Sequence, residues 1–352
     1  MTNMDNILEN VAIGRWSAQF KRSDRQVNKL HETDSELLEI PGLVDDYLAV
    51  TIDTVAEEIT TGLYREPFTM GWVTIMACLS DLAAVGAWPL GVVISVSCEP
   101  GRDQAFITEI ARGMEEACQT AGTSILGGDT NTTDAMSLTA CSFGLVPRIK
   151  MITRCGCRLG DEVCHGKSGQ WKCPWPGTPF GGSQRTVSRI RLPHAGPQAG
   201  ELIRKYGTAC MSTSDGLLST LDQLMRLNNN GFRIEFNPGG ILEPAVMKVC
   251  QETGTSPWMM LAGLHGEFVL VGTARPDAAG DLRAHGNAAG IEMIRIGKVV
   301  ERPDITLVSS EEKETVIDMV GIRNLLQDVG GNLERYLAEF WKIGEDTGLN
   351  SM

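Results

Sequence analysis

The chain has 352 residues, of which 42% are hydrophobic and 21% charged, as in a globular protein long enough for two domains. Its net charge of −13 at pH 7 argues against nucleic acid or an anionic membrane surface as a partner. No run approaches the ~18 apolar residues of a membrane span, and the polar N-terminus does not resemble a signal peptide. Together with ten scattered cysteines that suggest reduced thiols, these features predict a cytoplasmic protein.

The predicted elements mix helices and strands, with hairpins among them. Strands are expected at 35–40, 47–52, 90–96, 124–126, 137–146 and 268–271, and helices at 6–20, 68–85, 102–121, 202–206, 217–227 and over most of 311–343. The order favours an α/β (α+β) fold over a simple doubly wound sheet. We expect a first domain over residues 1–150 and a second over 151–352.

The first two strands place two aspartates side by side. Asp34 begins the first strand and Asp53 ends the second, so an antiparallel hairpin brings them together. Asp45 and Asp46 lie at the far end of the hairpin, about 23 Å from Asp53 at ~3.3 Å per residue, and are interpreted as a polar turn.

Two further aspartates are candidates for the same place. Asp81 lies near the C-terminus of an apolar helix, where a carboxylate opposes the helix dipole. Asp129 follows Gly127 and Gly128, whose backbones can adopt positive φ and approach a ligand closely. Because converging carboxylates repel unless a cation binds them, the sequence predicts an oxygen-only Mg²⁺ site.

Four short motifs carry a resemblance to a known family. They are Thr-Ile-Asp-Thr at 51–54, Ser-Asp-Leu-Ala-Ala at 80–84, Gly-Gly-Asp-Thr at 127–130 and Ser-Asp-Gly-Leu at 214–217. In this order and spacing, the chain resembles the AIR-synthase-like (PurM-like) ATP-binding superfamily, and within it the thiamine-monophosphate kinases.

The resemblance implies an ATP- and Mg²⁺-dependent phosphotransferase that moves the γ-phosphate of ATP to a small phosphorylated acceptor. It implies a homodimer formed through the N-terminal domain, with ATP near the interface. The metal ligands would be Asp34, Asp53, Asp81, Asp129 and Asp215, with Asp215 and Asp129 also catalytic, and the nucleotide-binding residues Gly127, Gly128, Thr130, Arg154 and Ser214.

The residues themselves are compatible with phosphoryl transfer by an enzyme that lacks a P-loop. Residues 160–168 come close to a P-loop, but five residues separate Gly160 from Gly166 where the loop requires four. An acceptor phosphate is already anionic, so positioning and charge neutralisation can supply most of the catalysis without a strong base. Two alternatives stay open: an AIR-synthase-like or hydrogenase-maturation-like enzyme that activates a carbonyl or amide oxygen, and a catalytically impaired scaffold.

Residues 164–198 do not fit the rest of the chain. The stretch from His165 to Pro197 has five Lys or Arg and no acid, is rich in Trp and Pro, and shows no periodicity. It could be a basic phosphate-binding loop, or a metal site from Cys155, Cys157, Cys164, His165 and Cys173, although that spacing matches no common zinc pattern. We favour a reading-frame error, because a one-base shift can encode a glycine-rich turn that opens an apolar helix. We then expect an irregular segment and a partly exposed helix from Leu217.

Overall fold

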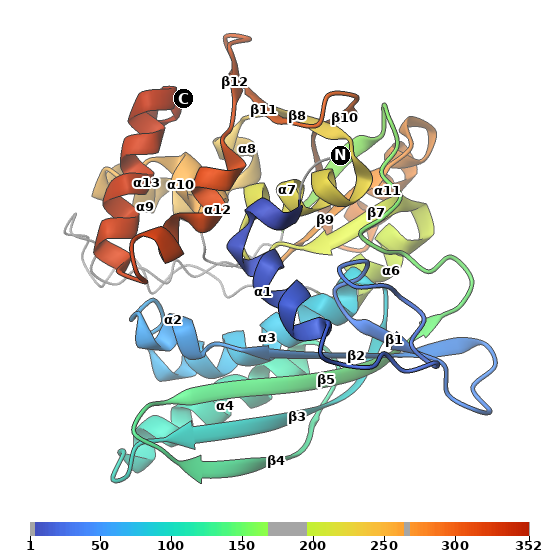
Figure 1. The fold of residues 1–352 in the computed structure, drawn as a ribbon, viewed down its shortest axis with the longest axis vertical. Helices are drawn as coiled ribbons and strands as arrows, with labels where there is room; N and C mark the ends of the chain where they lie inside the picture. Colours follow the sequence, from blue (N-terminus) through green and yellow to red (C-terminus); the bar gives the residue numbers. More distant parts are fainter. Residues whose placement is uncertain (1–3, 168–195, 264–267, 352) are drawn as a thin grey trace.

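The computed structural model describes residues 4–167, 196–263 and 268–351, which form two β-sheets with helices packed between and around them (Figure 1). The mixed α/β fold agrees with the sequence prediction.

The first sheet has five strands in the order β1-β2-β5-β3-β4. They are β1 (Glu36–Leu38), β2 (Asp46–Thr54), β3 (Trp88–Cys98), β4 (Ile125–Thr132) and β5 (Ser137–Pro147). All neighbours are antiparallel except β3 and β4. In β5 the even-numbered residues are buried and the odd-numbered ones partly exposed, which is the two-residue period of a sheet covered on one face.

The helices of this half are α2 (Ala56–Thr60), α3 (Pro67–Ala84) and α4 (Gln104–Thr120). The two longer helices approach closely because each contributes a glycine: a Cβ at Gly71 would lie 2.0 Å from the carbonyl oxygen of Ile110, and one at Gly113 equally near that of Phe68. Among the described residues, α3 is the one helix long and apolar enough to pass for a membrane span, but 89% of it is buried inside the protein. It is therefore a core helix.

The second sheet has seven strands in the order β12-β11-β8-β10-β6-β9-β7. They are β6 (Glu162–Lys167), β7 (Gly207–Ser212), β8 (Gly231–Glu235), β9 (Leu270–Ala274), β10 (Glu292–Val300), β11 (Ile305–Val308) and β12 (Glu314–Val316). Only β8 and β11 run parallel among these pairs.

Helices flank this sheet, and buried side chains from the helices and strands form two hydrophobic cores, one larger than the other. They are α6 (Pro197–Tyr206), α7 (Leu217–Asn228), α8 (Pro238–Ile241), α9 (Pro244–Thr253), α10 (Pro257–Ala262), α11 (Pro276–Ala288), α12 (Met319–Asp328), α13 (Leu333–Thr347) and the 3₁₀ turn η2 (Leu349–Ser351). The N-terminal elements η1 (Met4–Asn6) and α1 (Leu8–Ser17) lie against α7 and α12 (Figure 1).

Helix α3 joins the two halves. A Cβ at Gly200 of α6 would lie 2.0 Å from the carbonyl oxygen of Ala83, so the two helices are in backbone contact. The buried hydroxyls of Ser80 in α3 and Ser212 in β7 are 2.8 Å apart. The end of α3 is therefore fixed against both sheets. The first sheet ends at Pro147 and the second begins at Glu162, on either side of the predicted domain boundary.

The anomalous segment is shorter than predicted. Cys164 and His165 are buried in β6, inside the second sheet, and α6 begins at Pro197. The remainder, including Cys173, lies outside the described residues. The prediction of a partly exposed α7 is wrong: every residue from Leu217 to Arg226 is buried. Its covering comes from α10, α12 and the N-terminal segment, which the sequence reasoning had not assigned to this helix.

Candidate functional site

The centre of the candidate site is a pair of carboxylates between β2 and the end of α3. Asp53 is the last but one residue of β2, and Asp81 lies in the final turn of α3. Thr51 Oγ1 donates a hydrogen bond to Asp81 Oδ2 over 2.9 Å. A side-chain hydrogen-bonding interaction with Asp81 acts to lower the pKa of Asp53.

Burial sets the charge state of this pair. Burial raises the pKa of Asp53 to about 6, with the negative charges of Asp215 and Asp34 adding to the shift and the bond from Asp81 opposing it. Burial, followed by the charge of Asp53, also raises the pKa of Asp81 well above its ordinary value. Both groups therefore lose their protons at a higher pH than ordinary aspartates do.

A guanidinium lies beside these carboxylates. Arg154 Nε donates to Asp34 Oδ2 over 3.0 Å, and the Asp34 side chain is only 2% exposed. The other oxygen, Asp34 Oδ1, accepts from the backbone N–H of Ser212 at 3.2 Å. Burial lowers the pKa of Arg154, but the nearby charges of Asp34, Asp81 and Asp215 outweigh this and raise it. The charge of Asp34 acts on both Asp53 and Asp81, and both oxygens of Asp34 are already bonded.

Asp215 approaches the site from the second half of the chain. It lies just before α7, which begins after Gly216 at a φ of 82°. A Cβ at Gly216 would lie 2.5 Å from the carbonyl oxygen of Gly263, so the turn requires glycine. Burial and the charge of Glu9 raise the pKa of Asp215 to about 6, opposed by Arg323 and Arg154. Neither Ser214 nor Asp215 caps the helix.

Sequence reasoning missed Glu58, in the short helix after β2. Its Oε2 is buried and has no hydrogen-bond partner among the described residues. Burial raises the pKa of Glu58 to about 7, with smaller contributions from Glu57, Asp215 and Asp53. The adjacent Glu57 is exposed, and the sequence pattern does not distinguish the two.

The Gly-Gly-Asp-Thr motif lies apart from this group. Strand β4 continues from Ile125 to Thr132 through Gly127 and Gly128, neither of which has positive φ, so the expected turn is absent. Gly128 serves strand packing instead, because a Cβ there would lie 2.3 Å from the carbonyl oxygen of Ile94. Thr130 is exposed on the same strand.

The register separates Asp129 from the carboxylate pair. Asp53 is opposite Ala140, then Ile94, then Gly128, so β4 lies three strand spacings, about 14 Å, from β2. Asp129 is opposite Ser95, one residue along, and faces the other side of the sheet. The expectation that Asp129 shares one metal position with the other aspartates is therefore wrong within a single chain.

The donor set fits Mg²⁺ at the carboxylate pair. Among residues 4–167, 196–263 and 268–351, no group of three or more His, Cys, Asp or Glu is arranged to hold a metal ion. Mg²⁺, however, is commonly bound through one or two carboxylates together with water and substrate phosphates. Asp53 and Asp81 are partly buried and supply oxygen donors from two elements, and a divalent cation would offset the charge repulsion that raises their pKa values.

The cysteine-rich alternative receives no support from the described residues. Cys157 and Cys164 are buried, and burial raises the pKa of both thiols, which disfavours the thiolate that a metal requires. Thr273 Oγ1 donates to Cys157 Sγ at 3.7 Å, so that sulfur has a structural partner.

Comparison with known proteins finds a family match for the part of the chain that forms the first sheet. Residues 34–146 match the family model of the AIR synthase related protein N-terminal domain. Thiamine-monophosphate kinase of Halobacterium salinarum is 28% identical over 240 residues, covering 67% of this chain and 79% of that protein. The enzyme of the same name from Synechococcus elongatus is 27% identical over 288 residues, covering 76% and 83%.

Solved structures share the fold. A protein of Thermus thermophilus superposes with a TM-score of 0.71 at 22% identity, covering 85% of this chain and 96% of that one. Thiamine monophosphate kinase from Aquifex aeolicus gives 0.63 at 19% identity, covering 87% and 97%. The hydrogenase maturation protein HypE in complex with ATP gives 0.63 at 17%, covering 83% and 90%. The chain therefore carries an AIR synthase related N-terminal domain at residues 34–146, and the resemblance drawn from its motifs is confirmed.

Proposed function

We propose that this protein is an ATP- and Mg²⁺-dependent phosphotransferase of the thiamine-monophosphate kinase type, which transfers the γ-phosphate of ATP to a small phosphorylated acceptor. The observation that carries the proposal is the partly buried pair Asp53 and Asp81, on which the charges of Asp34 and Arg154 act, in a chain whose relatives include thiamine-monophosphate kinases. A solved structure of another protein in complex with AMPPCP and TMP shares the fold of this chain, with a TM-score of 0.67.

In this proposal Asp53 and Asp81 hold Mg²⁺. The ion, when bound, would neutralise the phosphate charge that builds up between donor and acceptor. Any proton on Asp53 would have to leave when the ion binds, so the affinity of the site should increase as the pH rises through about 6.

The remaining residues position charge. Arg154 is held by Asp34 and is largely buried, so its guanidinium is fixed where phosphate oxygens would approach the carboxylates. Asp215 bounds the opposite side of the site at the start of α7. An anionic acceptor phosphate needs no proton removed, which agrees with the absence of histidine from this group of residues.

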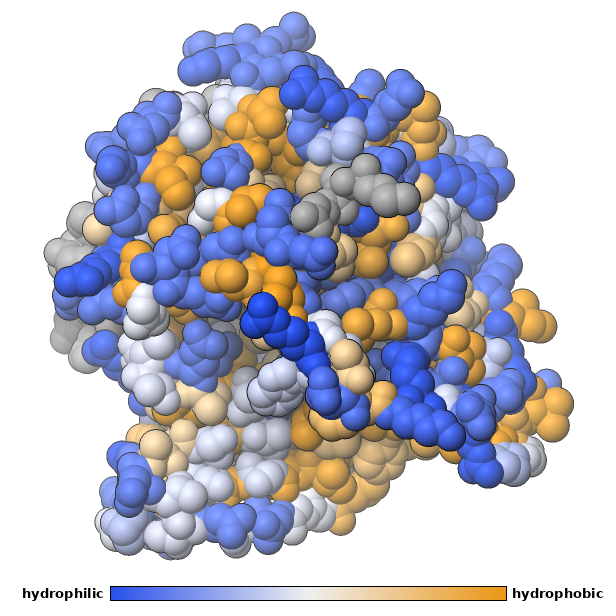
Figure 2. Space-filling view, in the orientation of Figure 1, coloured by the Kyte–Doolittle hydropathy of each residue, from blue (hydrophilic) through white to orange (hydrophobic). Residues whose placement is uncertain are grey.

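We propose a homodimer formed through the outer face of the first sheet. The face opposite α3 and α4 carries Ile52 and Leu126, which are 67% and 58% exposed, together with Val93. Figure 2 shows apolar residues gathered over this sheet, in the lower half of the view. Asp129 lies on the same face, opposite Ser95. A second copy seated here would cover the apolar residues, and Asp129, Thr130 and the glycines of β4 would serve the nucleotide only in that assembly.

The finer assignments follow from the same comparison. Thiamine monophosphate is the first acceptor to test, and a cytoplasmic location agrees with the buried thiols of Cys78, Cys118 and Cys210, which form no disulfide. The HypE structures share the fold alone at 17–20% identity, so activation of a carbonyl or amide oxygen is the alternative chemistry.

The proposal is tested by measuring Mg²⁺-dependent ATP consumption with and without candidate acceptors. Asp81→Asn should abolish acceptor-dependent turnover while leaving the circular dichroism spectrum unchanged, because the amide keeps the shape of the side chain but loses its charge. Turnover that survives in Asp81→Asn would contradict the assignment of the carboxylate pair.

A further inference from the structure

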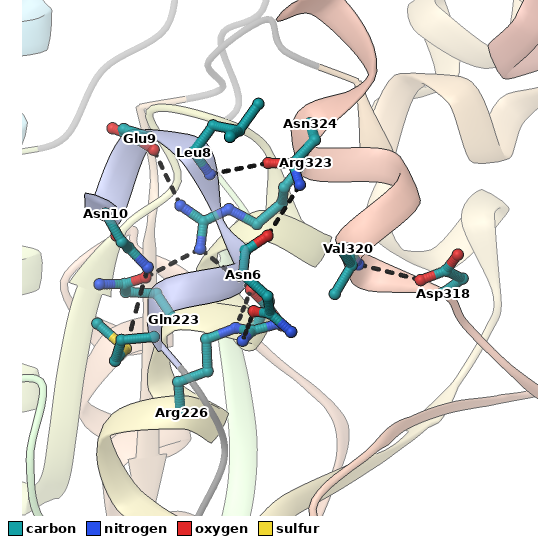
Figure 3. A network of polar contacts seen from close by, with 12 residues as sticks. Asn6, Leu8, Glu9, Asn10, Gln223, Arg226, Asp318, Val320, Arg323 and Asn324 are labelled. Atoms are coloured by element: carbon teal, nitrogen blue, oxygen red, sulfur yellow. Dashed lines mark hydrogen bonds and ion pairs between the residues drawn. The ribbon is translucent and has the colours of Figure 1, made fainter. Parts of the chain in front are cut away.

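Helix α1 is held to the second half of the chain by polar contacts (Figure 3). Leu8 N donates to Asn324 Oδ1 at 3.0 Å, and Asn10 Nδ2 donates to Gln223 Oε1 at 3.3 Å. Among the residues of α1, all of which the structure describes, Asn10 alone is buried, together with Ile7 directly before the helix. The helix thus rests on α7 and α12 mainly through polar groups, whereas the inner face of a surface helix is ordinarily apolar.

The apolar side chains of this segment face solvent instead. Trp16 is 74% exposed, and Phe20, in the turn after the helix, is 70% exposed. Leu8 and Ile13 are 45% and 38% exposed. Helical turns continue to Phe20, whose N–H donates to the Ser17 carbonyl at 3.1 Å, so the two aromatic rings are one turn apart. Exposed apolar side chains gathered in this way mark a surface that binds another body.

Cations without an acidic partner surround these aromatic rings. Residues 15–29 hold five Lys or Arg and one Asp, in a chain whose net charge is −13. In this stretch Arg22 lies 3.9 Å from Glu36, whereas Arg102 and Arg112 elsewhere are paired with glutamates at 2.5 and 2.7 Å. The other four cations are exposed and form no ion pair within the part of the chain that the structure describes: Arg15, Lys21, Arg25 and Lys29.

The charges decide which body could cover the aromatic rings. A second copy of this face would bring the same cations together, and like charges repel. An acidic protein would need a pocket shaped for two protruding rings, whereas a lipid bilayer accepts them without one. Trp and Phe bury well at the headgroup level of a bilayer, and Lys and Arg are attracted to anionic lipids.

We propose that α1 and the turn after it form a surface that binds the face of an anionic lipid bilayer, with Trp16 and Phe20 inserted among the headgroups and the four unpaired cations at the lipid charges. The polar contacts beneath α1 hold the helix in place, so little order has to be gained on binding. The acidic remainder of the chain does not prevent this contact, because charges more than about 8–10 Å away are largely screened at physiological salt. The inference is independent of the proposed function.

Co-sedimentation of the full-length protein with vesicles of phosphatidylcholine, with and without phosphatidylserine, tests the proposal. Wild type should bind the phosphatidylserine vesicles at least about tenfold more tightly, since each nearby cation contributes about fivefold. Trp16→Ser should bind at least about tenfold more weakly because the indole ring no longer inserts, and Lys21→Gln should bind the anionic vesicles about fivefold more weakly. The controls are Val44→Ser, at an apolar residue that is 76% exposed, and Lys248→Gln, which removes a cation paired with Glu252 at 3.7 Å; both should bind as wild type does.

The other outcomes reject a membrane surface. Wild type that does not bind phosphatidylserine vesicles, or Trp16→Ser that binds them equally well, overturns the proposal. A change of oligomeric state in Trp16→Ser without lipid, measured by light scattering, would make this face an interface between copies. Tight binding of wild type to soluble polyglutamate but not to vesicles would assign it to an acidic protein. ATP turnover in solution should be equal in Trp16→Ser and wild type, so the proposed function is accepted or rejected separately.

Discussion

Replacing Glu58 by glutamine should remove a specific part of the pH dependence of stability. The ordinary pKa of this glutamate is 4.5, and burial raises it to about 7 in the folded protein. The folded state therefore keeps a proton that the unfolded state releases between pH 4.5 and 7. Stability from this group is fully present below pH 4.5 and is lost as the pH rises through 7.

The size of the effect follows from the two pKa values. Each pKa unit corresponds to about 1.36 kcal/mol, so wild type should lose about 2.5 kcal/mol of unfolding free energy between pH 5 and 8 through Glu58 alone. Glu58→Gln has no proton to lose, and its difference from wild type should change by that amount over the same interval. The buried Oε2 has no partner to lose, so the amide adds no broken hydrogen bond on that side.

Urea unfolding at pH 5 and pH 8, without Mg²⁺ or nucleotide, measures the difference. Other carboxylates titrate in the same range, but they are common to both proteins and cancel in the comparison. The exposed neighbour Glu57 provides the matched control: its charge adds less than burial to the shift of Glu58, so Glu57→Gln should keep most of the pH-dependent loss of wild type. A constant offset between Glu58→Gln and wild type from pH 5 to 8 would refute the assignment of a raised pKa to Glu58.

Three further predictions concern the proposed metal, the proposed dimer and the glycines of β4. At pH 8, Mg²⁺ at a hundredfold excess over its Kd should stabilise wild type against thermal unfolding by about 2.7 kcal/mol. The Asp53→Asn variant should not be stabilised by Mg²⁺. Equal stabilisation of both proteins would show that Asp53 is not a metal ligand. Light scattering should find wild type dimeric and Ile52→Asp monomeric, with the exposed hairpin variant Val44→Asp still dimeric; a monomeric wild type at micromolar concentration would reject the interface. Gly128→Ala should lower the free energy of unfolding by about 1–3 kcal/mol because its Cβ would meet the neighbouring strand. Gly127→Ala has open space around it and should stay within about 0.5 kcal/mol of wild type. Similar effects at both positions would contradict the role of Gly128 in packing.

Much of the first half could be predicted from the sequence because its signals are local. The apolar run with Gly86 beyond its end predicts helix α3, and two runs of strand formers predict the antiparallel pair of β1 and β2. The position of Asp81 near a helix C-terminus, where a carboxylate is unfavourable, drew attention to a side chain whose pKa burial raises. These inferences needed only periodicity, turn residues and the length of a strand.

The errors arose where position depends on strand order or on distant segments. The Gly-Gly-Asp-Thr motif follows a short strand, but only the order of the sheet shows that Asp129 is three strands from Asp53 and on the other face. The exposure predicted for α7 failed because its cover includes residues near position 10, more than two hundred positions away. Glu58 was missed because burial, rather than residue type, distinguishes it from Glu57.

Transfer of the labelled γ-phosphate of ATP to thiamine monophosphate and a panel of other small phosphorylated acceptors tests the central claim most directly. We expect a labelled product with at least one acceptor, dependent on Mg²⁺, and lost in Asp81→Asn while the folded dimer persists. A folded wild-type protein that binds Mg·ATP but labels no acceptor phosphate, and instead consumes ATP only with carbonyl or amide substrates, would contradict the account.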